Sequence, residues 1–260
     1  MTDTATASAD TASSGERLLD ISGLSSGYAG VPVVRGLDLH VDAGEVVALL
    51  GPNGAGKTTT LLTVSGLLKV LEGSVNVLGE RTTFGAPHRT ARRGLAHVPE
   101  DRSLFFGLTV QENLKLGLRG NRAAQSAGYE EALELLPALR PLMGRRAGLL
   151  SGGEQQMLAM ARALVSKPKV LLVDEMSLGL APIIVERLLP IVRDIADRTG
   201  AGVLIVEQHV HLALEVADRA YVMSHGEIVL EGSASELIER QDLLEQSYLG
   251  GTLAEEEEGE

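Results

Sequence analysis

The sequence predicts an α/β fold built around a parallel β-sheet, interrupted by one helical insertion. Short apolar runs of strand length, such as Val46–Leu50 and Val170–Val173, are bounded by turn-forming residues. These runs alternate with stretches of helical pattern, an order typical of a parallel sheet covered by helices. No internal repeat is visible, so we expect one such unit. A chain of 260 residues is long enough to bury a core of its own.

The expected elements follow one another along the chain. In the first part we expect a helix after Gly56 and strands at Leu18–Ile21, Leu37–Val41, Val46–Leu50, Ser74–Leu78 and Leu95–Val98. Between about 105 and 150 the pattern becomes helical, with candidates at Val110–Leu118 and Tyr129–Leu136 and breaks at Pro137 and Pro141. The remaining elements are helices from Gly152 and Pro182, strands Val170–Val173 and Val203–Val206, and a closing hairpin of Tyr221–Met223 and Ile228–Leu230.

Composition excludes several classes of protein. The chain has no cysteine, so it has no disulfide, thiolate zinc site or iron–sulfur cluster. A net charge of −12 argues against a nucleic-acid partner, which would require a concentrated basic surface. The apolar runs are far shorter than the roughly 20 residues of a membrane helix, and the polar start with Asp3 and Asp10 predicts no signal peptide. We expect disorder over 1–16 and a solvated acidic tail over 252–260.

A phosphate-binding loop follows the strand Val46–Leu50 directly. It fits the pattern G-x-x-x-x-G-K-[ST] and comprises Gly51, Pro52, Asn53, Gly54, Ala55, Gly56, Lys57 and Thr58, with Thr59 next. Its glycines permit close approach of the backbone to phosphate, and the following helix points its positive end at the anion. The motif predicts that Lys57 reaches the β- and γ-phosphates of a nucleotide and that the Thr58 hydroxyl binds Mg²⁺.

Two acidic residues end the apolar run Val170–Val173. A run of this kind is typical of a strand buried on both faces, and its carboxyl end is where α/β sheets bind ligands. Asp174 is the candidate Mg²⁺ ligand, and Glu175 could polarise an attacking water. Taken alone, the pair could instead be the acidic cap of a helix.

A third segment, 150–156, reads Leu-Ser-Gly-Gly-Glu-Gln-Gln. Ser151 and Glu154 form a predicted capping box, and Gly152 and Gly153 leave the helix start open to an anion. Alone, the segment could be a helix cap and nothing more. In this order and spacing, it resembles the signature sequence of ABC ATPases, and the resemblance extends from about Leu18 to Gly251.

That resemblance implies a P-loop fold over 17–251 with a mixed sheet core, an N-terminal antiparallel β subdomain and an inserted helical subdomain at about 100–150. It also implies a dimer, in which Ser151, Gly152 and Gly153 complete the ATP site of a second ATPase subunit, identical or different. The segment Ser177–Leu180 occupies the place that contacts that subunit.

Further roles are implied position by position. Tyr28 matches the aromatic residue that stacks on adenine, although an isolated tyrosine could equally be a core residue. Glu100 stands where most relatives have a glutamine that contacts Mg²⁺, and Gln208 stands where most have a histidine that senses the γ-phosphate. His209, next to Gln208, is the alternative for that second role. Met176 replaces the usual proline, with little expected effect.

With these departures, the sequence resembles one subgroup of the family, the ATPase subunits of high-affinity branched-chain amino acid importers. The subgroup implies transmembrane permease partners on the cytoplasmic face of the cell membrane and, indirectly, an extracytoplasmic solute-binding protein. The helical insertion, with Glu100 at its base, is the expected permease-docking surface. The cargo stays open, since related systems carry urea, short amides or other amino acids, and an exporter is also possible. A DNA-repair ATPase or a translation factor fits less well, because the chain has one phosphate loop and an acidic balance.

Overall fold

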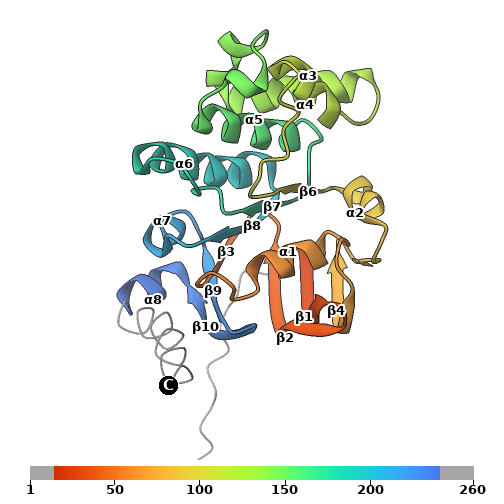
Figure 1. Ribbon diagram of the computed structural model, residues 1–260, viewed down its shortest axis with the longest axis vertical. Coiled ribbons are helices and arrows are strands. Elements are labelled where there is room, and N and C mark those ends of the chain that lie inside the picture. The colour runs from red at the N-terminus through yellow and green to blue at the C-terminus, as the bar shows by residue number, and fades with distance from the viewer. Residues whose placement is uncertain (1–14, 241–260) are drawn as a thin grey trace, which may run out of the picture.

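The computed structural model describes residues 15–240, which form two β-sheets and a set of helices (Figure 1). The predicted tails therefore lie outside the described residues, except for Gly15 and Glu16. The smaller sheet is antiparallel, in the order β2-β1-β4-β5. Its strands are β1 (Arg17–Tyr28), β2 (Val31–Asp42), β4 (Val70–Val77) and β5 (Glu80–Arg81). The implied N-terminal antiparallel subdomain is thus confirmed.

Two of these strands are much longer than the apolar runs that predicted them. β1 and β2 pair along twelve residues each, with register shifts between Ile21 and Leu24 and between Leu24 and Ser26. Gly23 and Gly36 adopt positive φ of 56° and 55° close to these shifts. Such bulges interrupt the alternation of apolar and polar residues, which is why the pattern ended early.

The larger sheet is mixed, in the order β10-β9-β3-β8-β7-β6. Its strands are β3 (Val46–Leu50), β6 (Leu95–Val98), β7 (Val170–Asp174), β8 (Gly202–Glu207), β9 (Arg219–Ser224) and β10 (Glu227–Ser233). All neighbours are parallel except β9 and β10, which form the predicted hairpin through His225 and Gly226. Every residue of β3, β7 and β8 is buried, as expected of strands covered on both faces.

Helices cover this sheet. The predicted ones are α1 (Lys57–Val64), α5 (Gly152–Leu164) and α6 (Pro182–Thr199). Three more, absent from the sequence-based prediction, are α2 (Pro87–Arg93), α7 (Val210–Leu214) and α8 (Ala234–Glu239). Each of these spans two turns or fewer, too short for a 3.6-residue repeat to show.

The helical insertion lies between β6 and α5 and occupies the end of the molecule remote from the antiparallel sheet (Figure 1). It comprises α3 (Val110–Gly117), α4 (Arg122–Leu135) and the 3₁₀ turns η1 (Pro137–Leu142) and η2 (Ala147–Leu149). α4 begins seven residues before the predicted Tyr129, because Asn121 caps it by accepting from the Ala124 N–H. Gly128, inside α4, is a poor helix former and interrupts the helical pattern of the sequence. A Cβ there would lie 2.4 Å from the Val165 carbonyl oxygen, so glycine lets α4 approach the end of α5 closely.

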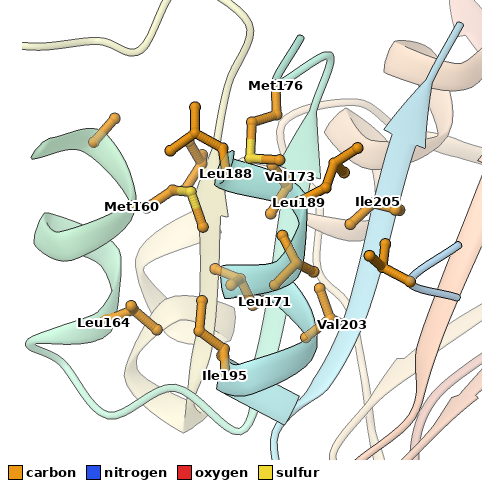
Figure 2. Packing of buried hydrophobic residues seen from close by; sticks show 14 of the residues in the cluster. Met160, Leu164, Leu171, Val173, Met176, Leu188, Leu189, Ile195, Val203 and Ile205 are labelled. Carbon is orange, nitrogen blue, oxygen red and sulfur yellow. The ribbon is translucent and has the colours of Figure 1, made fainter. Parts of the chain in front are cut away.

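The core has two layers, one on each face of the mixed sheet. Figure 2 shows one of them, in which Met160 and Leu164 of α5 and Leu188, Leu189 and Ile195 of α6 pack with Leu171, Val173, Val203 and Ile205 of the strands. This packing fixes the carboxyl ends of β7 and β8 side by side. Across residues 15–240, every helix is too short or too polar to cross a membrane.

Candidate active site

The loop between β3 and α1 is shaped by its glycines and by the distant β9–β10 hairpin. Gly51 and Gly56 have φ of 152° and 108°. A Cβ on Gly51 would lie 2.2 Å from the Met223 carbonyl oxygen, and one on Gly56 would lie 2.9 Å from Met223 Cε. No side chain caps α1, so its first N–H groups remain available to an anion. The loop therefore has the form of a phosphate cradle.

Lys57 is held inside this cradle. Its Nζ donates to the carbonyl oxygens of Gly51 at 2.8 Å and Pro52 at 2.9 Å, and it lies 3.6 Å from Glu175 Oε1. Burial lowers the pKa of Lys57, whereas the carboxylates of Glu175 and Asp174 act in the opposite direction. The ammonium is thus positioned by backbone oxygens and by one carboxylate.

Asp174, the last residue of β7, lies beside the start of α1. Its Oδ1 accepts a hydrogen bond from Thr58 Oγ1 at 3.4 Å. Burial raises the pKa of Asp174 to about 6, and the nearby carboxylates of Glu175 and Glu100 add to this, against the Thr58 bond. An adjacent cation would favour the ionised form. The oxygen donors of Thr58, Asp174 and Glu100 fit Mg²⁺, which takes one or two carboxylates together with phosphate and water.

Glu175 occupies a sharp turn after β7. Its φ is 43°, in the left-handed region that side chains other than glycine rarely adopt. Its N–H donates to the Val206 carbonyl oxygen at 3.0 Å, and its Oε2 accepts from Gln208 Nε2 at 2.8 Å. His209, in contrast, is exposed. The end of β8 therefore turns Gln208, and not its neighbour, toward Glu175.

These residues surround a cavity of about 370 Å³. Most of the predicted site residues line it, together with Val33 and Leu178: Asn53, Gly54, Gly56, Lys57, Thr58, Thr59, Glu100, Glu175 and Gln208. Gly51, Pro52 and Ala55 belong to the same loop, and Asp174 lies behind it, 2% exposed. Tyr28 does not line the cavity. It is 51% exposed and pairs with Val31, two residues from the lining residue Val33.

Ser151, Gly152 and Gly153 do not line the cavity either. The predicted capping box is present: Ser151 N donates to Glu154 Oε2 at 2.7 Å, and Glu154 N donates to Ser151 Oγ at 3.4 Å. Gly153 also has a packing role, because a Cβ there would lie 2.7 Å from Ile184 Cγ2 of α6. Within one chain, this segment and the phosphate loop are therefore separate features.

Two polar residues at the site had no predicted role. Arg102, with φ of 62°, donates to Gln156 Oε1 at 2.9 Å, to Gln155 Oε1 at 3.2 Å and to the Leu178 carbonyl at 3.4 Å. It joins the loop after Glu100 to α5 and to the segment after Glu175. Glu207, at the end of β8, is 1% exposed. An acidic residue ending an apolar strand is the signal that pointed to Asp174, and it was available for Glu207 too.

Comparisons with known proteins identify the family. Residues 34–177 match the family model described as ABC transporter. The chain is 42% identical to the high-affinity branched-chain amino acid transport ATP-binding protein BraG of Pseudomonas aeruginosa, over 90% of this chain and 100% of that protein. It is 38% identical to a probable branched-chain amino acid transport ATP-binding protein, LivF, of Archaeoglobus fulgidus, over 84% and 93%. It is also 36% identical to the lipopolysaccharide export system ATP-binding protein LptB of Escherichia coli K12, over 87% and 95%.

Solved structures give the same result. An ATP-binding subunit of an ABC transporter superposes with a TM-score of 0.77 at 28% identity, over 90% of this chain and 99% of that one. An ATP-binding cassette in its ADP conformation superposes with a TM-score of 0.76 at 26% identity, over 88% and 97%.

Proposed function

The chain belongs to the ABC transporter family, and on this premise we propose that it powers the import of branched-chain amino acids. The family makes it an ATP-binding subunit that couples ATP hydrolysis to transport and works with permease subunits. The proposal concerns the cargo, the direction of transport and the roles of individual residues.

The observation that supports branched-chain amino acids as the cargo is the 42% identity to BraG along that protein's whole length. The similarity to LivF points the same way. The 36% identity to LptB favours a second candidate, the ATPase of an exporter. An importer of urea, short amides or other amino acids is the remaining alternative.

We place ATP in the cavity over the phosphate loop, with adenine toward Tyr28. Lys57 neutralises the β- and γ-phosphates, and Thr58, Asp174 and Glu100 hold Mg²⁺, which supplies further charge neutralisation. Glu175 orients the attacking water or accepts its proton. Its two oxygens face Lys57 and Gln208, so the carboxylate is fixed before the nucleotide arrives.

A second ATPase subunit completes the site in this proposal. Ser151, Gly152 and Gly153 would face the phosphates bound by the partner, since a helix N-terminus suits an anion and Ser151, at the start of α5, is exposed. Leu178, within the segment Ser177–Leu180, and Ile183, just after it, are 45% and 53% exposed and offer apolar surface to that subunit. Closure of the dimer on ATP, and opening after hydrolysis, would supply the motion for transport.

The permease subunits would dock on the helical insertion. A cavity of about 380 Å³ lies between the core and α3, lined among others by Leu67, Phe105 and Leu116. These three side chains are 49%, 55% and 56% exposed, so they offer apolar surface to a partner. Glu100 lies five residues before Phe105, which links the docking surface to the ATP site. In this proposal, the chain works at the cytoplasmic face of the membrane, attached through the permease subunits.

The test is transport-coupled hydrolysis. The chain is reconstituted in proteoliposomes with its cognate permease subunits, and ATP turnover is measured with the cognate solute-binding protein. We expect leucine, isoleucine or valine to stimulate turnover. The amino acid should accumulate on the side of the membrane opposite to the binding protein. Stimulation by urea or an amide alone, or by lipopolysaccharide without any binding protein, would replace the cargo with one of the alternatives.

A further inference from the structure

Two neighbouring residues at the end of β8 hold the turn that follows β7. Gln208 donates to the side chain of Glu175, as described above. Glu207 reaches the next part of the same turn, where Ser177 N donates to Oε1 at 3.1 Å and the Ser177 hydroxyl donates to Oε2. The turn Glu175–Leu178 is therefore held at two residues: at the side chain of Glu175 by Gln208, and at the backbone N–H and hydroxyl of Ser177 by Glu207.

Glu207 is the more deeply buried of the two. At 1% exposure it has exchanged water for the donors of Ser177, which is itself 7% exposed. Burial raises the pKa of Glu207, opposed by the two Ser177 bonds. Burying a carboxylate costs free energy that two hydrogen bonds only partly offset, so a residue chosen for stability alone would be apolar here. A buried carboxylate at this position is expected if the geometry of the turn is needed for function.

The backbone of Glu175 shows what that geometry achieves. A left-handed φ in a residue other than glycine is strained and persists only where its surroundings enforce it. Two backbone hydrogen bonds hold the turn, from Glu175 N to the Val206 carbonyl and from Leu178 N to the Glu175 carbonyl at 3.1 Å. The hydrogen bonds between Glu207 and Ser177 hold it as well. The contact of Glu207 with Ser177 is made by a side chain, so substitution can remove it, as it can the bonds from Gln208 to Glu175 and from Arg102 to the Leu178 carbonyl.

We propose that Glu207 is a positioning residue for ATP hydrolysis: by holding Ser177 through two hydrogen bonds, it fixes the turn from which Glu175 enters the cavity. The inference rests on the role proposed for Glu175. Glu207 itself does not line the cavity. Since Ser177 also begins the segment Ser177–Leu180, the same contact sets the direction in which that segment leaves the site.

Two substitutions separate positioning from simple stability. Glu207→Ala leaves both Ser177 donors unpaired in the interior. Glu207→Gln can restore both bonds, because its amide oxygen accepts from Ser177 N while its amide nitrogen donates to the Ser177 hydroxyl, which is free to rotate. The phosphate loop is untouched in both variants, so the KM for ATP should stay near the wild-type value.

The experiment measures kcat and KM for ATP on the full-length chain assembled with its permease subunits. We expect Glu207→Ala to lower kcat about 10- to 100-fold, the scale of a displaced catalytic group, and Glu207→Gln to recover most of it. Ser177→Ala should lower kcat less, and adding it to Glu207→Ala should cost little more, since both act through one contact. Glu45→Ala is the matched control, because that carboxylate accepts from Arg219 at 2.7 Å at the amino ends of the strands, away from the cavity. It should lower the melting temperature and leave kcat unchanged.

The outcomes are distinguishable. A wild-type complex without ATP turnover would overturn the proposed function and this inference together. An active wild type with unchanged kcat in Glu207→Ala overturns the inference alone, as does an equal fall in kcat for Glu45→Ala. If Glu207→Ala does not fold, Glu207→Gln and Ser177→Ala decide: wild-type kcat in Ser177→Ala rejects positioning, and reduced kcat in Ser177→Ala with near-normal kcat in Glu207→Gln supports it.

Discussion

Gln208 donates a hydrogen bond to Glu175 at 2.8 Å, across the ends of two adjacent parallel strands. The bond occupies Oε2, whereas Oε1 faces the Lys57 ammonium. Gln208 thus has a contact with the carboxylate as well as a place at the cavity wall. Its effect on catalysis can pass through Glu175 as readily as through the γ-phosphate.

Gln208→Ala should therefore lower ATP turnover about tenfold or more, because the glutamate loses one of its two orienting partners. His209→Ala should have a small effect, since that side chain is exposed and outside the cavity lining. Turnover of the two variants in complex with the permeases gives the comparison. A reversed order would assign the role to His209, and negligible effects from both would remove this loop from the mechanism.

Glu175→Gln should keep nucleotide binding and slow hydrolysis roughly 100-fold or more, because an amide is a far weaker base than a carboxylate. ATP then persists in the closed dimer. Size-exclusion chromatography with Mg-ATP should show more dimer for this variant than for the wild type. An unchanged dimer fraction would count against the composite site.

Lys57→Ala should abolish ATP turnover, with a loss of roughly 100-fold or more, because it removes the cation at the β- and γ-phosphates. The fold should persist, since the ammonium bonds only to loop carbonyls and to Glu175. Circular dichroism checks the fold beside the ATPase assay. Normal hydrolysis by a folded variant would show that the site assignment is wrong.

His97 predicts a pH dependence of stability. Burial lowers its pKa to about 4 from 6.5, and its Nδ1 is 3.0 Å from Ser65 Oγ. Its Nε2 is buried and has no hydrogen-bond partner among residues 15–240. Because the folded-state pKa is depressed, the stabilisation is complete above pH 6.5 and is lost as the pH falls toward 4. The loss is up to about 3 kcal/mol. Urea unfolding of the wild type and His97→Asn between pH 7.5 and 5 should show a steeper decline for the wild type, and equal slopes would contradict the assignment.

The sequence predicted the parts of the fold whose signals are local. β3 and β6 have their predicted bounds because each is a short, mainly apolar run closed by glycine or proline. The phosphate loop and Asp174–Glu175 were found because their motifs lie on adjacent residues. What escaped prediction depends on partners far along the chain. Glu207 gains its contact with Ser177 only when β7 and β8 pair, and Arg102 reaches Gln156 only when the insertion folds back on α5. The short helices α2, α7 and α8 escaped because their periodicity is too brief.

The phosphate loop has a further dependence, which concerns the order of synthesis. Its motif ends at Thr58, yet the Met223 carbonyl and side chain bound Gly51 and Gly56, and Gly226 N donates to the Ala55 carbonyl at 3.0 Å. β3 also lies between β8 and β9, which are made more than 150 residues later. A nascent chain on the ribosome therefore carries the whole motif long before it can close the loop. The loop can reach the geometry described here only after the β9–β10 hairpin has been synthesised.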